Sequence, residues 1–113
     1  MMNKGFFISG TDTNIGKTVV ASILVNKLNA VYYKPIQCGL DEEGNKDSDI
    51  VRKICINKTI IKEAYFFRKP LSPNIASEED GKYIELNKLK LKASDLSKDL
   101  IIEGAGGLLV PIN

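Results

Sequence analysis

The 113-residue sequence contains no histidine and no tryptophan, and it has only two cysteines, Cys38 and Cys55. Without histidine, a Ser-His-Asp triad, a Cys-His dyad and a histidine-based zinc site are all excluded within this chain. Two cysteines that form no C-x-x-C pair cannot build a metal cage by themselves. Because no export signal is recognisable, we expect both to be reduced thiols of a cytoplasmic protein. Any catalysis by this chain must therefore use lysine, carboxylates, hydroxyls, backbone amides and a bound metal or cofactor.

Long hydrophobic runs and an excess of one charge are also missing. Apolar runs such as residues 108–110 are far shorter than the roughly 20 residues of a membrane span. Sixteen Lys and Arg against fourteen Asp and Glu leave a formal charge of +2, too small and too evenly spread to indicate binding of nucleic acid or of a membrane surface. With 43% apolar residues, the chain is expected to form a single domain over residues 1–113.

Short apolar segments alternate with segments of helical spacing. The expected strands are residues 5–9, 30–33, 65–67 and 100–102, and the expected helices are residues 17–29, 47–55, 74–80 and 86–96, although residues 88–92 also fit a strand. The first strand is expected to be buried on both faces. The apolar face of the first helix is expected at Val20, Ile23, Leu24 and Leu28. This alternation predicts an α/β fold with a parallel sheet that binds ligands at the carboxyl ends of its strands.

The loop between the first strand and the first helix reads Gly10-Thr-Asp-Thr-Asn-Ile-Gly-Lys-Thr18. A phosphate-binding loop works because backbone N–H groups around glycines surround phosphate oxygens at a helix N-terminus. Lys17 would then reach the β- and γ-phosphates, and the Thr18 hydroxyl would contact Mg²⁺. Five residues rather than four separate Gly10 from Gly16, so a plain glycine turn before a helix is the alternative.

Two further segments follow expected strands directly. Glu103, before Gly104-Ala-Gly-Gly107, is placed to contact Mg²⁺, or it is simply the first polar residue of an exposed turn. Lys34, before Pro35, is either a fixed cation that stabilises a developing anion or a solvated side chain. Asp49 is either a helix cap or part of the site, and Cys38 is expected to be a packing residue. Because these loops follow parallel strands, we expect residues 10–18, 34–39 and 103–107 to gather at one edge of the sheet.

Taken together, the order and spacing of these segments, with Ser48-Asp49, Ser72-Pro73 and Pro111, closely resemble dethiobiotin synthetase over essentially the whole chain. The resemblance implies a P-loop NTPase-like parallel sheet flanked by helices. It also implies an ATP- and Mg²⁺-dependent ligase, a homodimer, that converts 7,8-diaminopelargonate and CO₂ to dethiobiotin through a phosphorylated carbamate.

The resemblance also implies roles for individual residues. Lys34 and Lys17 would be catalytic, and the substrate would contact Thr13, Lys34 and Cys38. Relatives commonly carry serine at position 38, and a thiol is a weaker hydrogen-bond partner than a hydroxyl. Mg²⁺ would be held by Thr18, Asp49 and Glu103. The nucleotide would contact Asn14, Ile15, Gly16, Lys17, Thr18, Val19, Asp49, Glu103, Gly104, Ala105 and Gly106.

Members of this family are roughly twice as long, so we expect the sequence to be a truncated, N-terminal portion with little activity by itself. Three other readings remain open. One is an amidoligase of the cobyrinic acid diamide synthase type, and another is a P-loop module that binds nucleotide without catalysis. The third, a partitioning ATPase, is disfavoured because Asp12 stands where those proteins usually carry an additional lysine.

Overall fold

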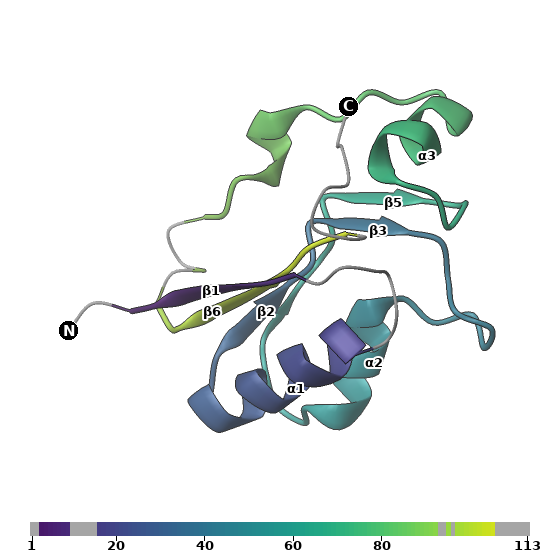
Figure 1. Ribbon diagram of the computed structural model, residues 1–113. Helices are drawn as coiled ribbons and strands as arrows, with labels where there is room; N and C mark the ends of the chain where they lie inside the picture. Colours follow the sequence, from purple (N-terminus) through teal and green to yellow (C-terminus); the bar gives the residue numbers. More distant parts are fainter. Residues whose placement is uncertain (1–2, 10–15, 93–94, 96, 106–113) are drawn as a thin grey trace.

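The computed structural model describes residues 3–9, 16–92, 95 and 97–105. Its elements in chain order are β1 (Gly5–Ile8), α1 (Gly16–Leu28), β2 (Val31–Tyr33), β3 (Ile36–Cys38), α2 (Asp47–Ile54), β4 (Ile60–Ile61), β5 (Tyr65–Phe67), α3 (Pro73–Glu79), the 3₁₀ turn η1 (Leu86–Leu89) and β6 (Leu100–Glu103) (Figure 1). The four predicted strands and the first three predicted helices are confirmed to within two residues at each end. The short strands β3 and β4 were not predicted.

The strands form two parallel sheets. The larger has the order β1-β6-β2-β4, and the smaller pairs β3 with β5. Helices α1 and α2 cover one face of the larger sheet, the segment around η1 lies over the other, and α3 packs beside the smaller sheet (Figure 1). The expected α/β architecture, a parallel sheet flanked by helices, is confirmed.

Only two residues, Lys34 and Pro35, separate β2 from β3, yet these strands belong to different sheets. Pro35 has no backbone N–H to continue the ladder of the larger sheet. Its carbonyl oxygen instead accepts a hydrogen bond from the backbone N–H of Tyr65 at the start of β5. The proline thus ends β2, as predicted, and directs the chain into the smaller sheet, leaving Lys34 between the two sheets.

The buried face of α1 differs from the predicted one. Val20 and Ile23 are 48% and 57% exposed, whereas Ala21, Ser22 and Val25 are fully buried. The Ser22 hydroxyl donates to the carbonyl of Thr18 one turn earlier, so its burial leaves no polar group unpaired. Small side chains let the helix lie close to the sheet. Of the predicted apolar positions Leu24 packs against the core, whereas Val20 and Ile23 are exposed, so helical spacing identified the buried face only in part.

Two other expectations are wrong. Strand β1 is not buried on both faces: Phe6 and Phe7 are 40% and 65% exposed, because within the described residues β1 stands at the end of the sheet and pairs only with β6. The helix expected over residues 86–96 is not formed as one element, because the 3₁₀ turn η1 ends at an extended Lys90. Leu89 packs against the smaller sheet and Leu91 against the larger one, so one helix face could not satisfy both contacts. Residues 93, 94 and 96 lie outside the described part.

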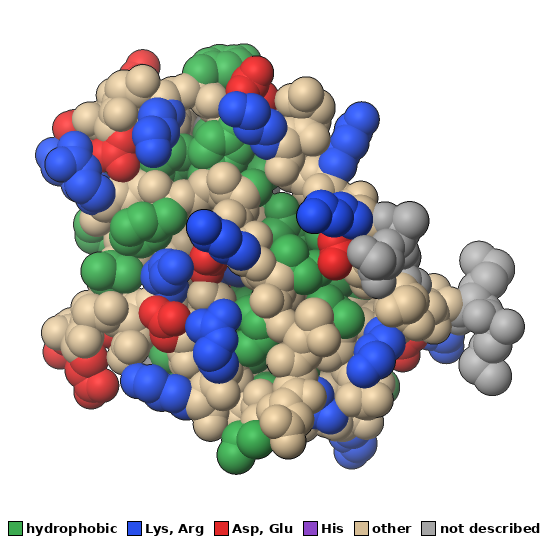
Figure 2. Space-filling model, turned by 180° about the vertical axis from the view of Figure 1, so that it is seen from behind, with side chains coloured by type: hydrophobic (Ala, Val, Ile, Leu, Met, Phe, Trp, Pro, Cys, Tyr) green, Lys and Arg blue, Asp and Glu red, His purple; other side chains and the backbone are tan. Residues whose placement is uncertain are grey.

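The surface carries interspersed charges of both signs (Figure 2). Lys and Arg side chains alternate with Asp and Glu on the face shown, with apolar side chains between them. In the described ranges, no helix has the length and apolar character that crossing a bilayer requires.

Candidate active site

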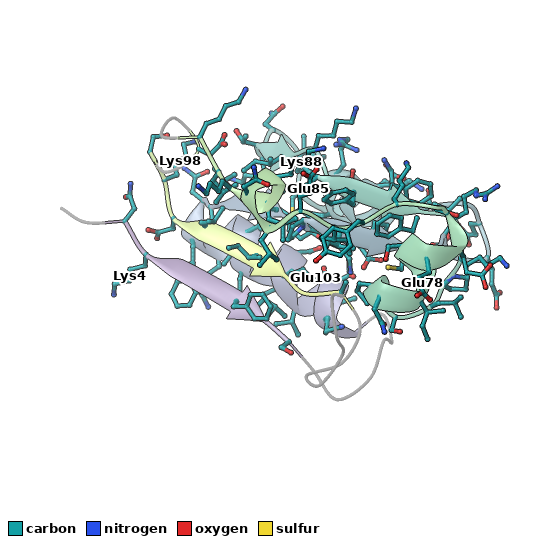
Figure 3. The ribbon with its side chains drawn as sticks, turned by 90° about the horizontal axis from the view of Figure 1, so that it is seen from above. Lys4, Glu78, Glu85, Lys88, Lys98 and Glu103 are labelled. Carbon is teal, nitrogen blue, oxygen red and sulfur yellow. The ribbon has the colours of Figure 1, made fainter. Side chains whose placement is uncertain are left out.

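Chain segments from three parts of the sequence meet at the carboxyl ends of β2 and β6. These strands are parallel and in register, with Tyr33 opposite Ile102, so the residues that follow them are neighbours. Lys34 follows β2 directly, and Glu103 is the last residue of β6. The first turn of α1 adds Thr18. Glu103 lies at the end of β6 remote from Lys4 and Lys98 (Figure 3). The expected gathering at one sheet edge is confirmed for Thr18, Lys34 and Glu103, whereas residues 36–38 belong to the smaller sheet.

The Glu103 carboxylate is the centre of this arrangement. Glu103 is only 1% exposed, so the solvated-turn alternative does not hold. Its Oε2 accepts hydrogen bonds from the Thr18 hydroxyl at 3.0 Å and from Lys34 Nζ at 3.2 Å. Its Oε1 accepts one from the Tyr32 hydroxyl at 2.9 Å. Burial raises the pKa of Glu103, and the charge of Lys34 opposes that rise.

Lys34 is a buried, multiply bonded cation rather than a solvated side chain. It is 4% exposed, and besides Glu103 its Nζ contacts Asp47 Oδ2 at 2.5 Å and the carbonyl of Gly104 at 3.3 Å. Burial by itself would lower the pKa of this ammonium, but the carboxylates of Glu103 and Asp47 together raise it above its usual value. The site therefore holds a positive charge at a fixed position throughout the neutral range.

Asp47, and not Asp49, lies beside Lys34. Asp47 begins α2, and its backbone N–H donates to Gln37 Oε1 at 3.0 Å. Burial would raise the pKa of Asp47, but Lys34 and the hydrogen bonds around it lower that pKa. Asp49 instead accepts from the backbone N–H of Lys46 and from Arg52. The structure thus does not bring Asp49 to Thr18 and Glu103.

Sequence reasoning missed two residues of this cluster, Asp47 and Tyr32. Residues two apart on a helix point about 200° away from each other, so Asp47 and Asp49 cannot face the same partner. The capping box offers the missing clue, because a carboxylate at the third helical position bonds back to the N-cap amide, and Asp49 holds that position. The sequence gives no comparable clue for Tyr32, because an aromatic residue in a buried strand is normally interpreted as part of the hydrophobic core.

The remaining predicted site residues are placed as follows. Lys17 is buried in the first turn of α1, and Val19 on the same helix is 40% exposed. Cys38 and Ala105 pack against the same apolar cluster of the smaller sheet. Burial raises the pKa of the Cys38 thiol to about 11, against the opposing charge of Lys34. Gly16 begins α1. Thr13, Asn14, Ile15 and Gly106 lie outside the described residues.

Comparison with known proteins decides the family. The sequence model of the AAA domain family matches residues 4–113. The chain belongs to this AAA domain family. Three curated relatives carry the name ATP-dependent dethiobiotin synthetase BioD. The chain is 47% identical to that of Christiangramia forsetii over 99% of its own length, 43% identical to that of Rhodopseudomonas palustris over 98%, and 44% identical to that of Brucella abortus over 99%.

These matches cover 53%, 51% and 52% of the three relatives, so the chain spans about half the length of the curated relatives it matches. The resemblance to dethiobiotin synthetase that the motifs indicated is thereby confirmed. By their names the relatives are ATP-dependent ligases.

The donor atoms at the sheet edge suit Mg²⁺. Within the described residues no group of three or more Asp, Glu, Cys or His side chains could hold a metal without help. Mg²⁺ is usually bound through one or two carboxylates plus phosphate oxygens and water, and it prefers such hard oxygen donors. The hydroxyl of Thr18 and the carboxylates of Glu103 and Asp47 provide this set, and two carboxylates against the one ammonium of Lys34 leave an excess of negative charge.

Proposed function

We propose that this chain provides the ATP- and carbamate-activating part of a dethiobiotin synthetase, an ATP-dependent carbon–nitrogen ligase. The reaction would convert 7,8-diaminopelargonate and CO₂ to dethiobiotin. The observation that carries the proposal is the buried ammonium of Lys34, which is held by Glu103 and Asp47 beside the first turn of α1. Relatives named as ATP-dependent dethiobiotin synthetases support it.

The proposed chemistry joins two anions. An amine of the substrate takes up CO₂ to give a carbamate, whose oxygen attacks the γ-phosphorus of ATP and displaces ADP. The second amine then attacks the carbamoyl carbon, phosphate leaves, and the amine gives up its proton as the ureido ring closes. Catalysis of such a step depends mainly on positioning and on neutralising charge. Lys34 and Lys17 would supply fixed positive charge without any histidine.

The remaining residues would bind and orient. Residues 14–19 and 104–106 would surround the nucleotide, and Thr13 and Cys38 would face the substrate. Thr18 and Glu103 would hold Mg²⁺ with a carboxylate from the first turn of α2, which is Asp47 by its position in the structure and Asp49 by the family motif. When bound, the ion would offset the charge of the phosphates. A cytoplasmic homodimer belongs to the same proposal.

Titration calorimetry with a non-hydrolysable ATP analogue, Mg²⁺, diaminopelargonate and bicarbonate tests this function. We expect the analogue to bind, and its affinity to rise when the substrate and bicarbonate are present. Lys34→Gln should keep nucleotide affinity within a few-fold and remove about tenfold or more of the substrate-dependent gain, because a charge-assisted contact is lost. The matched control is Lys69→Gln, since Lys69 forms an exposed ion pair with Glu79 and should change neither quantity.

Each alternative function predicts a different result in the same titration. A response to glutamine instead of diaminopelargonate would assign the chain to the amidoligase class. Binding of the nucleotide with no response to either substrate would leave a non-catalytic P-loop module. Failure of the wild-type chain to bind the analogue at all would remove the basis of the proposal.

A further inference from the structure

Tyr32 contacts the proposed metal-binding carboxylate, yet none of the roles above uses it. Its side chain is fully buried in the middle of β2. In the sheet, Tyr32 lies opposite Ile60 of β4 on one side and opposite Ile101 of β6 on the other. The ring belongs to the main apolar core between the larger sheet and helices α1 and α2. Only its hydroxyl is polar, and that hydroxyl donates to Glu103 Oε1 at 2.9 Å.

The two oxygens of Glu103 have different partners. Oε2 receives the Thr18 hydroxyl and the Lys34 ammonium, which are the groups assigned to metal and phosphate chemistry. Oε1 receives Tyr32 from the core side. The carboxylate is 1% exposed, so water cannot readily replace a lost donor. With Oε1 bonded to Tyr32, it is Oε2 that faces Thr18 and Lys34.

We propose that Tyr32 is a positioning residue that occupies Oε1 of Glu103 and thereby presents Oε2 alone to a divalent cation beside Thr18. The inference rests on the proposed function, because it assumes that Glu103 binds the metal of a nucleotide complex. Hydrogen bonds to the ligands of a metal ion orient those ligands and tune their basicity. A rigid ring packed on both sides suits this task, since the hydroxyl cannot move away from the carboxylate.

The neighbouring tyrosine provides a matched control. Tyr33 is also buried on β2, but alternate strand residues face opposite sides of the sheet. Its hydroxyl donates to the carbonyl of Leu89 at 3.3 Å, on the face covered by η1. Tyr33→Phe therefore removes a hydrogen-bonded tyrosine hydroxyl from the same strand without touching Glu103.

The test compares Tyr32→Phe with Tyr33→Phe by calorimetric titration of Mg²⁺, and of Mn²⁺ followed by electron paramagnetic resonance, in the presence of a saturating ATP analogue. We expect Tyr32→Phe to weaken metal affinity about 10- to 100-fold. Tyr33→Phe should leave it unchanged, and neither variant should alter binding of the metal-free nucleotide. A purely structural role would lower the unfolding midpoint of both variants without separating their metal affinities.

The outcomes are distinguishable. Metal affinity of Tyr32→Phe equal to that of wild type would overturn this inference and leave the proposed function standing. A wild-type chain that binds the nucleotide with no dependence on metal would overturn both. If Tyr32→Phe fails to fold, the infrared difference spectrum of the wild-type chain on metal binding decides, with the carboxylate band assigned by its loss in Glu103→Gln. A band splitting typical of a carboxylate bound through one oxygen supports the inference, and a splitting typical of both oxygens overturns it.

Discussion

Asp47 and Asp49 show how much a single helical position matters at the residue scale. The two carboxylates lie in the first turn of α2, but Asp47 pairs with Lys34 and Asp49 with the Lys46 amide and Arg52. Acidic side chains are favoured near a helix start, and both aspartates meet that rule. The capping box assigns Asp49 to the N-cap amide, and the hydrogen bond from the Asp47 amide to Gln37 holds the N-terminus of α2 where Asp47 lies beside Lys34.

Asparagine substitutions separate the roles of the two aspartates. Because Asp47 lies at the sheet edge, Asp47→Asn should weaken Mg²⁺ binding in the presence of an ATP analogue by about tenfold. Asp49→Asn should leave metal affinity unchanged and lower the free energy of unfolding by up to about 1 kcal/mol through the weakened cap. Calorimetry and urea unfolding measure the two effects. The reverse pattern would assign the metal contact to Asp49, as the family motif implies.

Cys38 should react slowly at neutral pH, because burial raises the pKa of its thiol to about 11. The reactive form is the thiolate, and a pKa near 11 leaves about one thiolate in a thousand at pH 8. The alkylation rate should therefore rise about tenfold per pH unit from pH 8 until the pH approaches 11. Iodoacetamide labelling followed by mass spectrometry of the peptide measures this dependence. A rate that levels off near pH 8.5 would show that the thiol is not shielded.

At the scale of single residues, the sequence predicted three members of the cluster correctly in position. Lys34 follows β2 directly, Glu103 is the last residue of β6 and Thr18 lies in the first turn of α1, and parallel strands bring such positions together. Tyr32 could not be predicted, because its function depends on the register between β2 and β6. That register places its hydroxyl against Glu103 and is set by side-chain packing across the sheet.

At the scale of elements, four of the six described strands were predictable, whereas β3, β4 and most of the buried face of α1 were not. Residues 30–33 and 100–102 are short apolar runs with β-branched or aromatic side chains, and both form central strands. Helix α1 buries Ala21 and Ser22 and exposes Val20, the reverse of what side-chain size suggests. Small residues allow a helix to pack closely against a sheet, and the spacing of hydrophobic residues along the sequence does not reveal this preference.

The turn after β3 depends on a glycine that cannot be replaced without strain. Gly39 has a φ of +77°, and a Cβ added there would lie 2.7 Å from the Cβ and 2.8 Å from the backbone nitrogen of Pro70. Its N–H donates to the carbonyl of Phe67 at 2.8 Å, so a shift of the backbone would break this bond to β5. The contact holds the turn that directly follows Cys38.

Alanine substitutions at two glycines separate backbone strain from steric clash. Gly44 has a φ of +82° but nothing within 4 Å of an added Cβ. Gly44→Ala should therefore cost only the left-handed conformation, about 1 kcal/mol of unfolding free energy. Gly39→Ala should cost about 3 kcal/mol, because overpacking against Pro70 adds to that strain. Equal losses in urea unfolding would mean that the Pro70 contact relaxes freely.

At the scale of the whole molecule, the alternation of strands and helices was enough to predict one parallel sheet, but the second sheet was unforeseen. Strand β3 is only three residues long and begins directly after a proline, which sequence rules treat as a break. From its apolar sequence alone, β1 was expected to be buried on both faces. Its exposed Phe6 and Phe7 give the described part of the chain an apolar edge strand, the kind of surface that promotes association.

The two-residue link between the sheets has a mechanical consequence. Proline restricts the backbone at that junction, and the Pro35 carbonyl is bonded to the Tyr65 amide of β5. The point at which the chain leaves the larger sheet is thus fixed directly beside the residue whose ammonium contacts Glu103 and Asp47. A substitution that displaces β3 is therefore expected to move Lys34 Nζ away from both carboxylates.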